Sequence, residues 1–297
     1  FIYYQERPDA PWSYVLESTE ALKDLADRKV GLQSVISIKE PLDSEDDKYD
    51  SSYKGPFYVD IDLDGEPQLA MDSARKFSDK LQDLGVNTYA IYLSGKKGFH
   101  FIIPMTTFAK DRPVKSLPLI YKEMALELYV NGVDMAVYNQ GKPRLLRTAN
   151  VKRKDNGKYK VPISLKELDE LTVEKYAQLT EAPRPELQAI QPVTSTRFQT
   201  LYETAKIKMQ KKQKALSALV FVPDDELSKT VTADGKLPQC ITLLIVNGDI
   251  KSGANFNQAS ILFAAYMFRA VVNNFVKHAQ YMSKTVKSSM FNSYFPC

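Results

Sequence analysis

The sequence contains very little of what builds a disulfide framework or a zinc site. It has two cysteines and two histidines, so zinc could be bound only with help from carboxylates. No apolar run reaches the roughly 18 residues that a membrane-spanning helix needs, and no charged segment with an apolar core opens the chain as a secretion signal would. We therefore expect a cytoplasmic protein that works in a reducing environment and has no membrane partner.

A largely disordered chain is also excluded, because 44% of the residues are hydrophobic and 26% are charged. A chain of 297 residues can form one large domain or two modest ones. It begins at Phe1 and ends at Cys297, directly after an aromatic stretch, so we expect both ends to have been cut from a longer polypeptide.

The net charge of +4 is small, but acidic and basic residues lie in separate segments. Residues 43–64 contain eight acidic residues, residues 142–160 contain eight basic ones, and residues 206–214 contain five lysines. Such a separation is typical of a protein that holds a divalent metal at one place and phosphates at another. Each run taken alone is equally compatible with solvated surface charge.

The hydrophobic pattern predicts an α+β fold in the first half of the chain. Residues 57–64 alternate apolar and acidic residues, which predicts a half-buried strand with its acids on one face. Apolar residues at helical spacing follow over 70–84 and stop at Gly85, a natural helix end. Two more strands are predicted at 88–94 and 99–105, joined by a turn that contains two glycines.

Later segments complete the predicted core. Residues 117–131 are predicted to be helical, and residues 143–149 and 159–163 to be further strands of the same sheet. We therefore expect helices on one face of the sheet and polar groups on the other. The expected domains are a catalytic domain over 1–175, a basic helical linker over 176–235 and a small helical C-terminal domain, cut short, over 236–297.

Aspartates on the first predicted strand could bind metal. Asp60 and Asp62 are two residues apart, so both side chains leave the same face with Cβ atoms roughly 6–7 Å apart. Ligation by oxygen alone favours Mg²⁺ or Mn²⁺. Asp134, in a Gly-Val-Asp segment, can supply a third carboxylate, whereas Asp64 precedes a glycine and is interpreted as a turn residue. Aspartate pairs are also common at strand ends, so the pair alone does not establish a metal site.

The turn between the next two predicted strands could bind phosphate. Its glycines let backbone N–H groups come close to a phosphate, and its polar side chains offer donors of different reach. It lacks the spacing of a Walker loop. A single histidine is more often structural, but here it is out of phase with its apolar neighbours and faces away from them. The candidate nucleotide-binding residues of this segment are Ser94, Lys97, Gly98 and His100.

A basic segment follows, and its side chains could hold a triphosphate or the backbone of a template. A basic surface strand is the alternative interpretation. The candidate residues are Arg144, Arg147 and Lys152.

In this order, the segments resemble the archaeo-eukaryotic primase superfamily, which includes the small catalytic primase subunit, the primase-polymerases and many phage and plasmid primases. The resemblance covers about residues 50–165 and depends on four ordered motifs. These are Asp60-x-Asp62; Ser94-Gly95-x-x-Gly98-x-His100; Val133-Asp134; and Arg144-x-x-Arg147 followed by Asn150-x-Lys152 and Gly157-x-Tyr159-Lys160-Val161-Pro162.

The resemblance implies an RRM-like sheet and a primase or primase-polymerase that makes primers on single-stranded DNA from NTP or dNTP by two-metal nucleotidyl transfer. It also implies a replicative helicase as partner. Where many members carry Ser-x-His, this chain has Asn150-Val151-Lys152, and the zinc knuckle of some members has no counterpart. The implied roles are metal binding by Asp60, Asp62 and Asp134, contact of Ser94 and His100 with the incoming triphosphate, and contact of Arg144, Arg147 and Lys152 with phosphates.

A second resemblance concerns the end of the chain. Residues 237–241 and 294–297 resemble the first two cysteine segments of the iron–sulfur domain of the primase large subunit, with Cys240 and Cys297 as cluster ligands. Such a cluster needs four thiolates, so the resemblance implies that two more lie beyond Cys297. Two unrelated cysteines are the alternative.

Three other functions are alternatives to primer synthesis, and each requires different sequence features. A non-catalytic single-strand-binding module would carry surface aromatics on its sheet without aligned carboxylates. A rolling-circle nicking initiator needs a paired-histidine metal site and a tyrosine nucleophile, whereas His100 stands alone in its segment. A metal-dependent nuclease would use the same carboxylates, and the sequence leaves this alternative open.

Overall fold

The computed structural model describes residues 1–41, 51–63, 65–141, 143–185, 187 and 191–218. The chain divides into two compact units, Phe1–Leu216 and Ser217–Cys297. The expected C-terminal domain over 236–297, including Cys240 and Cys297, lies outside the described residues.

A four-stranded antiparallel sheet forms the centre of this unit. Its strands are β6 (Phe57–Ile61), β7 (Ala90–Leu93), β8 (Phe99–Ile103) and β11 (Val161–Ile163), in the spatial order β11-β7-β8-β6. The predicted hairpin of β7 and β8 and the predicted strand at 159–163 are both present, with Leu93 paired to Phe99 and Val161 paired to Leu93. The predicted α+β class, with antiparallel sheets, is confirmed.

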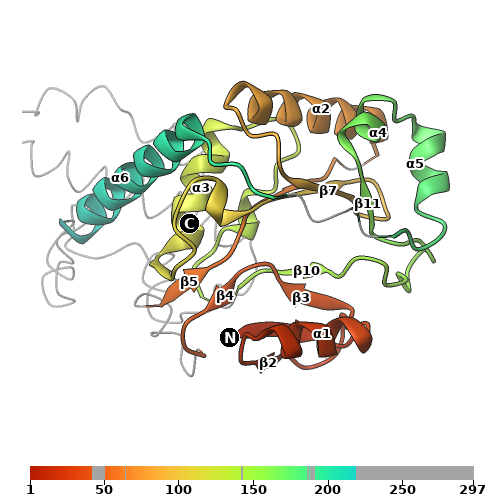
Figure 1. The fold of residues 1–297 in the computed structure, drawn as a ribbon, viewed down its shortest axis with the longest axis horizontal. Coiled ribbons are helices and arrows are strands. Elements are labelled where there is room, and N and C mark those ends of the chain that lie inside the picture. Colours follow the sequence, from red (N-terminus) through yellow and green to blue (C-terminus); the bar gives the residue numbers. More distant parts are fainter. Residues whose placement is uncertain (42–50, 64, 142, 186, 188–190, 219–297) are drawn as a thin grey trace, which may run out of the picture. The chain divides into compact units, whose positions relative to one another are not determined.

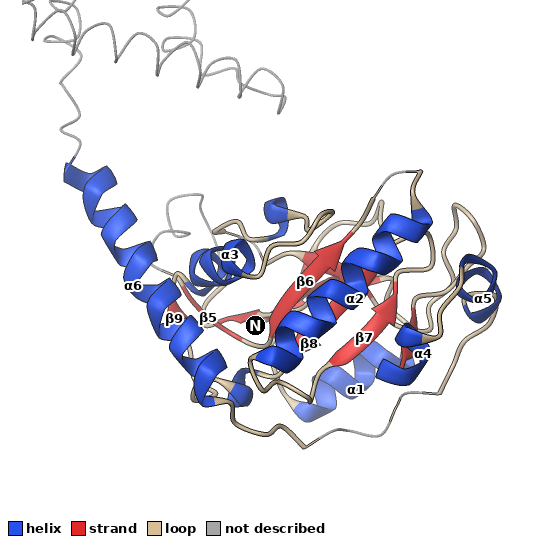
Figure 2. Cartoon of the chain, turned by 90° about the horizontal axis from the view of Figure 1, so that it is seen from above, coloured by secondary structure: helices blue, strands red, loops and turns tan. Residues whose placement is uncertain are grey.

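Helices cover one face of the central sheet. Helix α2 (Pro67–Asp83) packs on β6 and β8, and α3 (Leu117–Glu127) packs on β6 (Figures 1 and 2). Helix α2 ends where its sequence predicts, because Gly85 takes the left-handed conformation, with φ of +74°, and donates its N–H to the carbonyl of Gln82. Two shorter helices, α4 (Leu165–Asp169) and α5 (Val173–Leu179), follow β11.

A second four-stranded sheet lies at the N-terminus. Its strands are β1 (Ile2–Gln5), β2 (Ser13–Val15), β3 (Leu32–Ser34) and β10 (Leu145–Arg147), in the order β10-β3-β1-β2, and α1 (Thr19–Asp27) follows β2. Strand β10 corrects one expectation, because residues 143–149 were predicted to join the central sheet. Strand β11 takes the free edge of β7, and β10 instead pairs with β3. Three residues carry no pattern that could identify so distant a partner.

Smaller elements complete the unit. A three-stranded sheet has the order β4-β5-β9, and two short 3-10 helices, η2 (Met105–Thr107) and η3 (Met135–Val137), follow β8 and precede β10. The strands of this sheet are β4 (Ser37–Ile38), β5 (Ser52–Lys54) and β9 (Val114–Lys115). Among the described residues, the search for a membrane-spanning helix finds none of sufficient length and apolarity.

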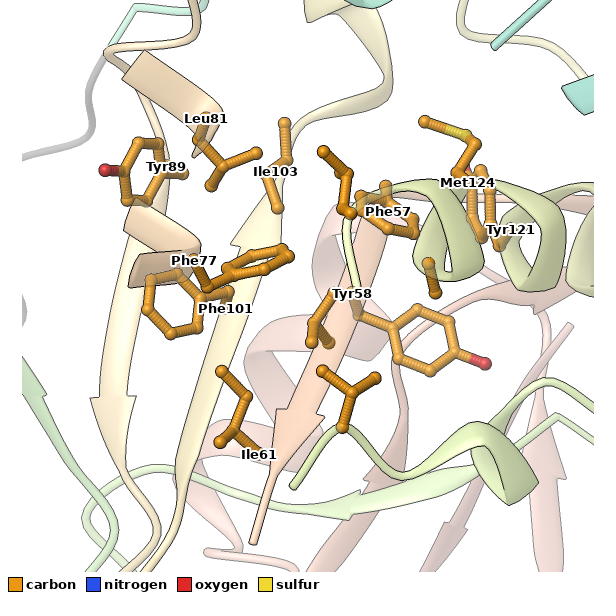
Figure 3. Packing of buried hydrophobic residues seen from close by; sticks show 14 of the residues in the cluster. Phe57, Tyr58, Ile61, Phe77, Leu81, Tyr89, Phe101, Ile103, Tyr121 and Met124 are labelled. Atoms are coloured by element: carbon orange, nitrogen blue, oxygen red, sulfur yellow. The ribbon is translucent and has the colours of Figure 1, made fainter. Parts of the chain in front are cut away.

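The core lies between the central sheet and its helices (Figure 3). Aromatic rings meet there edge to face, such as Phe77 with Phe101 at 4.9 Å and Phe57 with Tyr121 at 5.3 Å between centroids. Strand β6 is buried on both faces, because Tyr58 is also covered and only 1% exposed. The prediction of a half-buried strand was therefore wrong, and Asp60 is the one residue of β6 that is not fully buried.

Helix α6 (Thr196–Ala218) belongs to the same unit, although it carries the second basic run. Its buried residues recur at helical spacing and join the main core. Lys208 and Lys212 form ion pairs with Glu127 and Glu123 of α3, the latter at 2.6 Å. Part of the basic face therefore serves helix packing. The buried residues of α6 are Phe198, Tyr202, Ala205 and Met209.

Candidate active site on the polar face of the central sheet

One row of side chains crosses the polar face of the central sheet. The register pairs Asp60 with His100, His100 with Tyr92, and Tyr92 with Pro162, so one residue of each strand lies in this row. Because strand side chains alternate between faces, the apolar neighbours of these residues point to the helix-covered face instead. The alternation thus separates a buried apolar face from a face that carries ionisable groups.

A third chain segment brings Asp134 to this row. The N–H of Asp134 donates to the carbonyl of Asp60 at 2.9 Å, and the N–H of Asp62 donates to the carbonyl of Gly132 at 2.8 Å. Ile61 and Val133 pair between them as an isolated antiparallel bridge. This pairing covers the outer edge of β6 and places Asp134 opposite Asp60 on the same face, with Asp62 just beyond the strand end.

Glycine is required where this segment approaches β6. Gly132 has a φ of +87°, and a Cβ built on it would lie 2.7 Å from Cγ of Leu63 and 3.2 Å from the carbonyl oxygen of Asp62. Only a residue without a side chain allows the backbone to come so close. The Gly-Val-Asp segment thus needs glycine at position 132, because a side chain there would prevent the backbone pairing that places Asp134 beside Asp60.

The electrostatics of Asp60 reflect both burial and crowding. Its side chain is 17% exposed. Burial, followed by the negative charges of Asp134 and Asp62, raises its pKa to about 6, although Arg144 and Lys160 act in the opposite direction. Burial is the largest of these effects, and a cation bound beside the carboxylates would favour the charged form of Asp60. Such a site favours one more cation.

Each carboxylate has its own partner in the chain. Asp60 Oδ1 lies 3.5 Å from Nε2 of His100, and Asp62 Oδ1 lies 3.7 Å from Nζ of Lys97. Asp134 Oδ1 accepts a hydrogen bond of 2.8 Å from the N–H of Ala136. Within the ranges that the structure describes, no three His, Cys, Asp or Glu side chains are gathered closely enough to hold a metal ion. The donor chemistry fits Mg²⁺ or Mn²⁺, and joint ligation would require these side chains to turn toward one another.

The turn between β7 and β8 is held by its own hydrogen bonds. Ser94 donates its N–H to the carbonyl of Gly98 at 2.9 Å, and Ser94 Oγ accepts the N–H of Gly98 at 3.0 Å. Tyr176 adds a hydrogen bond of 3.0 Å from its hydroxyl to the same carbonyl. A Cβ on Gly98 would meet the carbonyl oxygen of Ile61 at 2.5 Å, so this glycine also allows a close backbone approach. The N–H of Gly98 is therefore already used inside the turn.

His100 is buried and electrically neutral. Its side chain is 7% exposed, and its pKa lies well below the ordinary value because of burial and the positive charges of four nearby cations. Nδ1 of His100 has no hydrogen-bond partner within the described part of the chain. A buried polar nitrogen without a partner is uncommon and fits a site that awaits a ligand. The four cations are Lys160, Arg147, Arg153 and Arg144.

Two of these cations were not among the candidates drawn from the sequence. Lys160 is buried, donates to the carbonyl of Arg147 at 2.9 Å, and lies 4.6 Å above the ring of Tyr92. Arg153 donates to the carbonyl of Ser94 at 3.3 Å. The sequence held a signal for Lys160, since it precedes Pro162 by two residues and therefore shares its face.

The remaining candidates take different positions. Arg144 and Arg147 come from the N-terminal sheet, where Arg144 is exposed and Arg147 is half-buried. Burial and the charge of Arg153 lower the pKa of Arg147. Lys152 is exposed and forms an isolated bridge with Tyr159. The structure thus brings Arg144 and Arg147 near His100, which lies in the row that also carries Asp60.

Comparisons with known proteins add a distant structural likeness. No protein-family model matches the chain, and no curated protein matches it. Among solved structures, the chain is similar to the polymerase domain of Mycobacterium tuberculosis ligase D in complex with DNA, with a TM-score of 0.36 and 18% identity over 70% of each chain. A likeness this distant assigns no function, so the functional inference depends on the residues of the site.

The close approach at Gly132 predicts a position-specific loss of stability. Gly132→Ala should lower the free energy of unfolding by about 1–3 kcal/mol more than Gly65→Ala does, because it adds a clash to the cost of a positive φ. Gly65 has a similar φ of +76°, but nothing lies within 4 Å of a Cβ built there. Urea unfolding followed by circular dichroism measures both. Equal losses would show that Leu63 and the Asp62 backbone move aside freely.

The raised pKa of Asp60 predicts a pH-dependent gain in stability when its charge is removed. The folded-state pKa is about 6 against a reference value of 3.8, so ionisation of Asp60 destabilises the fold as the pH rises between these values. In metal-free buffer at about pH 7.5, Asp60→Asn should be more stable than wild type by about 1–3 kcal/mol, and the gain should shrink near pH 4.5.

The matched control for this prediction is Asp155→Asn. Hydrogen bonds from Arg153 lower the pKa of Asp155 to about 2, so its charge is favourable in the fold and its removal should bring no gain. Urea unfolding of both variants at the two pH values, with a chelator present, decides the sign. A loss of stability in Asp60→Asn at the higher pH would contradict the unfavourable charge.

Proposed function

We propose that this chain is a template-directed nucleotidyltransferase that makes primers on single-stranded DNA. It would use Mg²⁺ or Mn²⁺ and take NTP or dNTP as substrate. One observation carries the proposal. Asp60 and Asp134 lie on one face with a neutral His100 and four nearby cations, and Asp62 lies just beyond the end of β6. Adjacent acidic and basic groups are what a reaction between a metal-bound triphosphate and a hydroxyl requires.

The acidic side of this arrangement supports metal binding. Asp60, Asp62 and Asp134 would hold the divalent cations, which when bound would activate the attacking hydroxyl and stabilise the pyrophosphate leaving group. The raised pKa of Asp60 supports this role, because an added positive charge would relieve the repulsion from its two acidic neighbours. The backbone pairing of Asp134 with Asp60 gives the carboxylates a rigid base.

The basic side supports binding of a triphosphate. Arg144, Arg147, Arg153 and Lys160 act together on His100, so their combined positive charge is concentrated at one point of the polar face. Arg147 and Lys160 approach from two different sheets and are linked through the Arg147 carbonyl. His100 is neutral, and its Nδ1 is buried without a partner in the described part of the chain. This nitrogen would donate to a phosphate oxygen when it carries the proton and the side chains that cover it move aside.

The other functions weighed above make different predictions. A nuclease would use the same carboxylates but would cleave single-stranded DNA without added nucleotide. A binding module without catalysis would have no use for three carboxylates at the end of one strand. The helicase partner and the iron–sulfur cluster at Cys240 and Cys297 remain predictions, and both cysteines lie outside the described residues.

Removal of a single carboxylate should separate catalysis from binding. Asp60→Asn and Asp62→Asn should each abolish nucleotide addition while leaving binding of single-stranded DNA nearly intact, because the carboxylates serve the metal. The assay supplies varied single-stranded templates, with and without a primer, in Mg²⁺ or Mn²⁺ and with each nucleotide class. Asp79→Asn, an exposed acid on α2, is the control and should retain activity.

Two outcomes would overturn the proposal. Undiminished synthesis by Asp60→Asn across a metal titration would remove the carboxylates from the chemistry. Degradation of the template by wild type, with no incorporation of nucleotide under any condition, would favour the nuclease. Synthesis on primed templates alone would narrow the proposal to a polymerase.

Lys160 should contribute to nucleotide binding. Lys160→Met should raise KM for the triphosphate by about tenfold or more, since a charge-assisted hydrogen bond to phosphate contributes about 1.5–3 kcal/mol. Lys158→Met is the matched control, because Lys158 lies two residues away and pairs with Glu181 at 3.1 Å. Steady-state kinetics and urea unfolding of both variants separate binding from folding. A KM unchanged in a folded Lys160→Met would exclude this role.

A further inference from the structure

Exposed apolar residues line the edge strand of the N-terminal sheet. Trp12, Tyr14 and Leu16 are 41%, 50% and 67% exposed, and they occupy alternate positions at and around β2. Val15, between them, packs instead toward Ile2 and the inner residues near α1. Isolated exposed apolar residues are ordinary, but three in alternation on one face of an edge strand form a continuous patch.

The aromatic rings of this patch are held in place by contacts with rings of the neighbouring strand β1 and of Phe1. Tyr3 of β1 is 3% exposed, and its ring lies 6.0 Å from Trp12 and 5.5 Å from Tyr14 between centroids. Phe1 meets Tyr14 edge to face at 5.6 Å. Rings fixed by such contacts lose little conformational freedom when a flat ligand stacks on them. The patch is therefore a preformed stacking surface.

The sheet register connects this surface to the candidate active site. Tyr14 pairs with Tyr3, while Gln5, on the same face of β1 as Tyr3, pairs with Leu32. Leu32 in turn pairs with Arg147. The same face thus carries aromatic rings at the β2 edge and a cation of the site at the β10 edge. Three strand spacings separate the two edges, or about 14 Å.

We propose that Trp12 and Tyr14 form a base-stacking platform for single-stranded DNA beside the active site. Aromatic side chains bind unpaired bases of any sequence through their flat faces, and nearby cations bind the phosphates that link those bases. Arg147 supplies a complementary positive charge at the β10 edge of this face, and Lys160 of the candidate active site donates a hydrogen bond to the Arg147 carbonyl. The platform would hold template bases outside the site of the proposed primer synthesis, and so it rests on the proposed function.

The single tryptophan of the chain makes this platform directly observable. The experiment titrates the full chain with an oligothymidylate, in a chelator and without nucleotide, and follows tryptophan fluorescence. Stacking of a base on Trp12 should quench the signal, whereas a blunt duplex, whose bases are already stacked, should quench it little. Fluorescence anisotropy of a labelled oligothymidylate then gives the affinity of each variant.

The variants test the two rings separately. Trp12→Ala and Tyr14→Ala should each bind the oligothymidylate about tenfold more weakly, which is typical for removal of one stacking partner. Tyr129→Ala is the matched control, since Tyr129 is 49% exposed and follows α3, and its affinity should equal that of wild type. Tyr14→Leu keeps apolar contact with Tyr3 but cannot stack, so it should also bind weakly even if the alanine variant folds poorly.

Several results would overturn the platform. The first is the absence of quenching, and the second is an equal affinity of Trp12→Ala and wild type for the oligothymidylate. The third is quenching that depends on protein concentration and is accompanied by dimer formation in sedimentation experiments, which would show that β2 instead pairs with a second copy. Asp60→Asn separates the two proposals, because it should still quench and bind. Binding of the oligothymidylate by wild type without any nucleotide addition would refute the proposed function alone. If Trp12→Ala and Tyr14→Leu add nucleotides and bind the oligothymidylate as well as wild type does, the platform alone is refuted.

Discussion

The backbone pairing between residues 132–134 and the end of β6 is the constraint on which the site depends. Two hydrogen bonds join the segments, and they place Asp134 opposite Asp60 although the two lie far apart in the chain. The pairing is possible because Gly132 adopts a positive φ beside Leu63, and because Gly98 lets the β7–β8 turn approach Ile61 from the other side. The strand end that carries the acids is thus held by two glycines that touch its backbone.

The charges of the site work against the stability of the fold. Burial and two neighbouring acids raise the pKa of Asp60, and burial and four cations lower the pKa of His100. A chain selected only for stability would not bury ionisable groups of both signs on one sheet face. The arrangement becomes favourable once a cation meets the acids and an anion meets the basic groups. The raised pKa of Asp60 therefore supports a site for a cation, and the cations around His100 support a site for an anion.

The hydrophobic pattern of the sequence predicted those elements whose formation depends on neighbouring residues in the chain. Alternation and helical spacing identified β6, the β7–β8 hairpin and α2, including its end at Gly85. They failed for β10, whose three residues cannot specify a partner strand, and for β6 as a half-buried strand, because burial depends on which segments pack above it. Lys160 was recoverable from its spacing to Pro162, whereas Arg153 reaches the site through a loop that no periodicity describes.

Ion pairs determine which basic surfaces are available to nucleic acid. The basic run of α6 is one of the segments whose sequence is typical of phosphate binding, but Lys208 and Lys212 pair with glutamates of α3, and the helix packs on the core through its apolar side. On the polar face, Arg153 likewise pairs with Asp155 at 2.8 Å, and burial together with the nearby cations lowers the pKa of His100. A basic segment thus indicates nucleic-acid binding only where the fold leaves its charge unneutralised. Among the described residues, the exposed rings at the β2 edge and half-buried Arg147 at the β10 edge are therefore better candidates for contact with a single strand than the paired lysines of α6.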